Sequence, residues 1–156
     1  MIGLNDKKTV DVSAPNLINI CIDKNQKHEK QGRFYHRYSV NPILFTDLTS
    51  LLIEADRLMD KIDYPQASIR SRNFFDDRQE NIKEKGAERV KTTDNILSES
   101  GKKATFVVNV QYRQNATWQG KVLWAETEKS CNFRSALELL KLIDGALEEA
   151  KAWAQS

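Results

Sequence analysis

Two segments of this chain share a pattern of residues at a constant offset of 88 positions. Gly32 recurs as Gly120, and Phe45 recurs as Phe133. The further identities at this offset are Gln31 with Gln119, Leu51 with Leu139, Leu52 with Leu140 and Asp56 with Asp144. A repeated unit restricts the fold strongly, because each copy must bury its apolar face against its neighbour. We therefore expect two copies of one supersecondary unit.

Alternating apolar residues predict a strand at the start of each copy. Ile18, Ile20 and Ile22 would share one face of the first strand, and residues 106, 108 and 110 would do so in the second copy. Residues 33–40 and 121–127 have the aromatic and β-branched content of the strands that follow. Residues 67–74 are a candidate additional strand.

Helical spacing of apolar residues follows the strands in both copies. Residues 46–62 predict one helix, with Asp47 near its start as a cap. Ser135 and Glu138 have the spacing of a capping box, which predicts a second helix running to about Trp153.

The predicted fold is therefore α+β, with a duplicated ββα unit in one compact domain. An antiparallel sheet of about five strands would carry two main helices on one face, since a single ββα unit is marginal alone. We expect an irregular lead-in over residues 1–15 and the first half, with its extra strand, over 16–75. A charged connector would span 76–103, either solvated or helical, and the second half would span 104–156.

The composition narrows the functional classes. The net charge of +2 is too small to indicate nucleic acid or an anionic membrane as partner, although it does not exclude nucleic acid. No apolar run reaches the length of a signal peptide or membrane helix, so we expect a cytoplasmic protein with no membrane partner. Cys21 and Cys131 are then expected to be free thiols in a reducing compartment.

Recognisable catalytic patterns are absent from the sequence. It contains no Gly-rich phosphate loop, no GxSxG and no HExxH. His28 and His36 have no evident nucleophile or metal-binding partners. We therefore expect no cofactor and no metal, and interpret the chain as a non-enzymatic binding or regulatory protein. An enzyme whose catalytic residues assemble from scattered positions stays an alternative.

A polar sheet face is the candidate binding surface. If both helices cover one face, the other would present arginines beside aromatic residues, a combination that suits phosphates and stacked bases. The candidate residues are Arg33, Tyr35, Arg37, Arg70, Arg72, Asn109, Gln111 and Arg113. The hypothesis is a nucleotide-like anionic ligand on this face or in a dimer groove. The alternatives are a protein-interaction module, including a homodimeric adaptor, and a single-stranded nucleic-acid binder.

Two resemblances to known families add to this interpretation. Residues 112–120 and 132–140, together with residues 32–38, resemble a family of small uncharacterised bacterial proteins, chiefly from the Clostridia. That resemblance covers about residues 32–148 and implies no function.

PilZ domains, which bind cyclic diguanylate, provide the second resemblance. Residues 33–37 are similar to their RxxxR motif, and residues 115–120 are similar to their [DN]xSxxG motif with threonine in place of serine. The resemblance implies a nucleotide ligand and adds Asn115, Thr117 and Trp118 to the candidate ligand-binding residues. The chain departs from PilZ domains in the long separation of its motifs and in its ββα units, because PilZ domains are six-stranded barrels.

Overall fold

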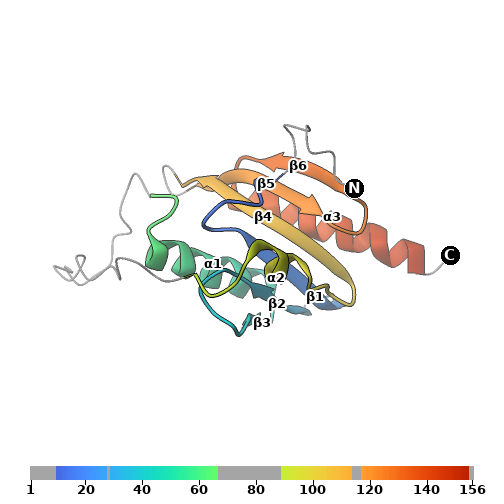
Figure 1. The fold of residues 1–156 in the computed structure, drawn as a ribbon. Helices are drawn as coiled ribbons and strands as arrows, with labels where there is room; N and C mark the ends of the chain where they lie inside the picture. Colours follow the sequence, from blue (N-terminus) through green and yellow to red (C-terminus); the bar gives the residue numbers. More distant parts are fainter. Residues whose placement is uncertain (1–9, 28, 67–88, 114–116, 155–156) are drawn as a thin grey trace.

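The described part of the chain folds as one antiparallel sheet with helices on it. The structure is a computed structural model that describes residues 10–27, 29–66, 89–113 and 117–154. The sheet has the strand order β3-β2-β1-β4-β5-β6 (Figure 1). Its elements are β1 (Ile18–Gln26), β2 (Glu29–Tyr35), β3 (Ile43–Phe45), α1 (Leu48–Ile62), α2 (Thr93–Leu97), β4 (Ala104–Tyr112), β5 (Gln119–Trp124), β6 (Lys129–Phe133) and α3 (Ala136–Ala154). The predicted α+β class is confirmed, with six strands rather than five.

The main core lies between the sheet and the helices α1 and α3. Strand residues at alternate positions, such as Ile20 and Phe106, are buried there against Leu51 of α1 and Ile143 of α3. Alternation on the strands and helical spacing on α1 and α3 therefore place their apolar residues in one layer, as the sequence predicted.

The duplication is repeated in the register of the strands. Gly32 pairs with Phe45 between β2 and β3, and Gly120 pairs with Phe133 between β5 and β6. A β-bulge falls between Ile22 and Lys24 on β1, and another falls between residues 110 and 112 on β4. Each of these features recurs at the sequence offset of 88 residues. The repeated unit is βββα, because each half contains one more strand than the sequence indicated.

The two additional strands are short and lie at the edges of the sheet. β3 has three residues and β6 has five, and β6 carries mostly polar side chains. Residues 33–40 were predicted as a single strand, but β2 ends at Tyr35. Residues 67–74, a candidate strand, lie outside the described residues.

Equivalent caps start the two long helices. The carboxylate of Asp47 accepts a hydrogen bond from the Ser50 backbone N–H at 2.6 Å, and Ser135 Oγ accepts one from the Glu138 N–H at 3.0 Å. These side chains satisfy amides that have no partner within the first turn. The predicted helix starts are confirmed.

The centre of the second sheet face is covered, so the prediction of an open face is wrong there. Val10 of the lead-in, Leu17 just before β1 and Ile96 of α2 form a smaller core with sheet residues. The sheet contributes Cys21, Tyr35, Val107 and Leu123. Residues 89–103, expected as part of a charged connector that is either solvated or helical, include the short helix α2, which packs on the sheet (Figure 1).

Candidate ligand pocket

Arg33 and Tyr35 lie together, and each contacts other protein groups. Arg33 Nε donates to Tyr35 Oη at 2.8 Å, while the same guanidinium forms an ion pair with Asp23. Lys91 Nζ lies 4.4 Å from the centre of the Tyr35 ring, which is a cation–π contact. This cluster joins β1 and β2 to the segment that precedes α2.

Arg37 holds the lead-in against the sheet. Its side chain is buried, and it donates from Nε to Ala14 O at 3.0 Å and from Nη2 to Val12 O at 2.6 Å. Burial lowers the pKa of this guanidinium. Its own backbone carbonyl accepts hydrogen bonds from the N–H groups of Val90 and Lys91. The residue thus fastens two segments that cover the second sheet face.

Arg113 lies on the opposite side of the sheet from the one predicted. The bulge on β4 shifts the alternation by one residue, so the Arg113 side chain extends towards α1. Its Nε donates to Pro65 O at 2.8 Å, and its Nη1 pairs with Asp60 at 2.8 Å and with Asp56 at 3.3 Å. This arginine connects the end of β4 to α1 and the residues after it.

Replacing Arg113 with methionine should lower the free energy of unfolding by about 2 kcal/mol, because the buried carbonyl of Pro65 would lose its donor. Asp56 and Asp60 are about half exposed and would regain water, which limits the loss. Urea unfolding of Arg113→Met beside Arg57→Met measures the effect. Arg57 is a suitable control because its side chain is 71% exposed. Equal losses in the two variants would contradict the structural role of Arg113.

The remaining predicted residues are dispersed. Asn109 and Trp118 are buried, Gln111 is exposed and Thr117 is partly buried. Arg70, Arg72 and Asn115 lie outside the described residues. The described members of the predicted set therefore form separate contacts rather than one site.

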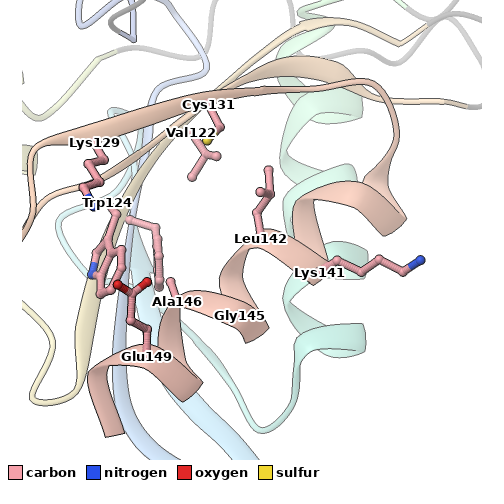
Figure 2. Close-up of a pocket in the computed structure, with 10 residues that line it drawn as sticks. Val122, Trp124, Lys129, Cys131, Lys141, Leu142, Gly145, Ala146 and Glu149 are labelled. Atoms are coloured by element: carbon pink, nitrogen blue, oxygen red, sulfur yellow. The ribbon is translucent and has the colours of Figure 1, made fainter. Parts of the chain in front are cut away.

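A pocket of about 400 Å³ lies between α3 and the strands β4–β6 (Figure 2). Its volume falls within the range of small-molecule sites. The strands contribute Phe106, Val122, Trp124, Lys129 and Cys131, and α3 contributes Lys141, Leu142, Gly145, Ala146 and Glu149. Apolar side chains therefore form much of the wall, and charged side chains border it.

The difference between the two repeats explains why space is left here. Phe34 pairs with Ile20 in the first repeat, and Val122 pairs with Val108 at the equivalent position of the second. Phe34 is fully buried, whereas the smaller Val122 lines the pocket. On the helix, Gly145 occupies the position equivalent to Arg57, and a Cβ added there would have no atom within 4 Å. The smaller valine at residue 122 thus leaves space in the second repeat, whereas Arg57 and Gly145 both lie at the surface.

Polar groups gather at the end of the pocket that contains Trp124. Trp124 and Lys129 are paired across β5 and β6. Glu149 extends from α3 with its carboxylate towards Trp124, whereas the Lys141 side chain extends away from the pocket (Figure 2). The Trp124 ring stacks on Trp153 at 5.2 Å between centroids. Its buried Nε1 has no hydrogen-bond partner among the described residues. The pocket can therefore offer an aromatic surface and two charges.

The two cysteines differ in accessibility. Cys131 is exposed at the pocket wall, whereas Cys21 is fully buried in the smaller core. Burial raises the pKa of the Cys21 thiol to about 12, so it stays protonated at neutral pH. Thiol reagents should consequently modify Cys131 and report on occupancy of the pocket.

The sequence reasoning missed every residue of this pocket. A signal was available in the duplication: Val122 is smaller than Phe34, which occupies its position in the first repeat. Such size differences between repeats indicate where one copy has lost packing volume.

Comparison with known proteins gives no assignment, because no protein-family model, curated protein or solved structure matches the chain. Within the described ranges, no three histidine, cysteine, aspartate or glutamate side chains are placed to hold a metal ion. In the same part of the chain, none of the helices has the length and apolar character needed to cross a bilayer.

Proposed function

We propose that this chain is a non-enzymatic binding or regulatory protein whose ligand is a small molecule held in the pocket between α3 and β4–β6. The pocket itself is the observation that carries this proposal. The pocket of about 400 Å³ is open to solvent on one side and reaches inward to the buried Val122, Phe106 and Trp124. An apolar wall with few polar groups is the usual composition of a ligand site.

The first experiment uses Cys131 as a reporter of occupancy. The rate of alkylation by a maleimide is measured with and without 1-anilinonaphthalene-8-sulfonate, an amphiphilic probe with an apolar ring system. We expect the probe to slow alkylation of Cys131 several-fold in the folded protein. Unchanged alkylation at saturating probe would contradict the proposal, because Cys131 lines the pocket.

Two substitutions at one position provide the control. Gly145→Leu should fill the pocket and abolish protection by the probe, whereas Gly145→Ala should retain much of it. Both variants should remain folded, because a Cβ at residue 145 meets no other atom and glycine weakens a helix by about 1 kcal/mol relative to alanine. A leucine variant that is more stable than wild type yet still protected by the probe would place binding elsewhere.

The nucleotide-like anion predicted from the sequence is tested in the same assay with a separate set of compounds. Its support comes from the aromatic surface of Trp124 and from Lys129, since bases stack on aromatic rings and phosphates attract lysine. Protection of Cys131 by ATP or cyclic diguanylate, lost in Gly145→Leu, would favour that ligand class over an uncharged amphiphile.

A further inference from the structure

We infer that the pocket accepts a free α-amino acid with a bulky apolar side chain, an inference that depends on the function proposed above. Two groups at the Trp124 end of the pocket carry it: the ammonium of Lys129 and the carboxylate of Glu149. The amino acid would place its side chain in the apolar part and its head group between these two.

Opposite charges stand on opposite walls of this end. Lys129 comes from the edge strand β6, and Glu149 comes from α3 (Figure 2). Among the described residues, neither charged group has an ion pair with the other or with a third side chain. A ligand that carries both charges on adjacent atoms can pair with both walls, whereas a simple acid or amine would face one like charge.

Lys129 and Glu149 determine which charge of the ligand lies where. Lys129 pairs with Trp124 across β6 and β5, and the ligand's carboxylate fits beside its ammonium group. The ligand's ammonium group is then left for Glu149 on α3.

The apolar part of the pocket suits a large side chain. Phe106 and Val122 from the sheet and Leu142 and Ala146 from α3 form its walls, and the open position at Gly145 adds room. The Trp124 ring, already stacked on Trp153, offers a flat surface. Aromatic and long aliphatic side chains are therefore favoured over small ones, because they bury more apolar area.

The test compares three compounds that share one apolar body and differ in charge: L-phenylalanine, 3-phenylpropanoate and 2-phenylethylamine. Each is titrated against the full chain at about millimolar concentration, with Cys131 alkylation and calorimetry as readouts. We expect L-phenylalanine to bind about tenfold more tightly than either singly charged compound. Equal or tighter binding of the acid or the amine would overturn the inference.

Two variants cross-check the assignment of charges. Lys129→Met should weaken phenylalanine and phenylpropanoate about fivefold and leave phenylethylamine unaffected or improved. Glu149→Gln should weaken phenylalanine and phenylethylamine to a similar extent and spare phenylpropanoate. If both variants weaken all three compounds equally, the head group does not lie between these residues and the inference fails.

The two proposals fail in different ways. If the anilinonaphthalene probe protects Cys131 but none of the three compounds does, the pocket binds ligands and the amino-acid assignment is wrong. If neither the probe nor any compound protects Cys131, the proposed function fails as well. Exposed Lys151 offers a control, because Lys151→Met changes the same charge outside the pocket lining and should leave all affinities unchanged.

Discussion

Gly120→Ala should destabilise the protein by roughly 3 kcal/mol or more, and Gly32→Ala should do the same. A methyl group at residue 120 would overlap the carbonyl oxygen of Asn109 on the neighbouring strand, and one at residue 32 would overlap that of Cys21. These neighbours are backbone atoms, which cannot rotate away as a side chain can. Strand separation would have to increase at both places.

The bulges explain why glycine is needed at these two positions. Gly120 pairs with Val110 immediately before the bulge on β4, and Gly32 pairs with Ile22 immediately before the bulge on β1. A bulge bends its strand and increases the local twist. Beside both bulges, a carbonyl oxygen of the neighbouring strand occupies the space that a Cβ would need. A glycine opposite a β-bulge is therefore one structural motif that occurs twice in the fold.

Urea unfolding of the three variants Gly32→Ala, Gly120→Ala and Gly145→Ala tests this interpretation. The third is the matched control, because the same methyl group enters open space on α3 and should raise stability by about 1 kcal/mol. A loss below 1 kcal/mol for either strand variant would mean that the sheet adapts easily there. A variant too unstable to show an unfolding transition would agree with the prediction.

The features that repeat over many residues were predictable from the sequence. The duplication, the helix starts at Asp47 and Ser135 and the inward face of β1 and β4 all follow from spacing, because periodic burial leaves a periodic pattern. The edge strands β3 and β6 were missed because three and five residues are too few to display a period.

The side-chain directions of the predicted site residues were only partly predictable. One bulge on β4 changes the sheet face on which the Arg113 side chain lies, and no residue type near it indicates a bulge. Arg33, Arg37 and Arg113 all resemble ligand-binding arginines in composition, yet each is engaged by protein oxygens. The sequence alone could not distinguish these uses, because a guanidinium has the same donors for a carbonyl as for a phosphate.

The covering of the second sheet face was equally hard to predict. Val10, Leu17 and Ile96 supply its apolar contacts from otherwise polar segments, and Arg37 and Asn19 add hydrogen bonds to backbone carbonyls. So few apolar residues, two in irregular chain and one in a five-residue helix, give no periodic signal. Periodicity also gave no indication of the pocket, because empty volume depends on differences in size between apolar residues, and only the comparison of Val122 with Phe34 between the repeats points to it.

His36 makes the stability of the fold depend on pH. Its side chain is 6% exposed, and Nδ1 accepts a hydrogen bond from the Tyr38 backbone N–H at 3.0 Å. Burial, with a smaller contribution from the positive charges of Lys61 and Lys91, lowers the pKa of this imidazole from 6.5 to about 4. The folded protein therefore keeps His36 neutral at pH values where the unfolded chain protonates it.

The free energy of unfolding should accordingly decrease as the pH drops below about 6.5, because the unfolded state binds a proton that the folded state excludes. The His36 contribution is absent above that pH, reaches about 2 kcal/mol at pH 5 and about 3 kcal/mol at pH 4. Urea unfolding of wild type and His36→Gln between pH 7.5 and pH 4.5 isolates it, since all other titrating groups are shared. The variant should lose less stability than wild type across this range. Parallel curves for the two proteins would show that His36 is protonated as readily in the folded state as in the unfolded one.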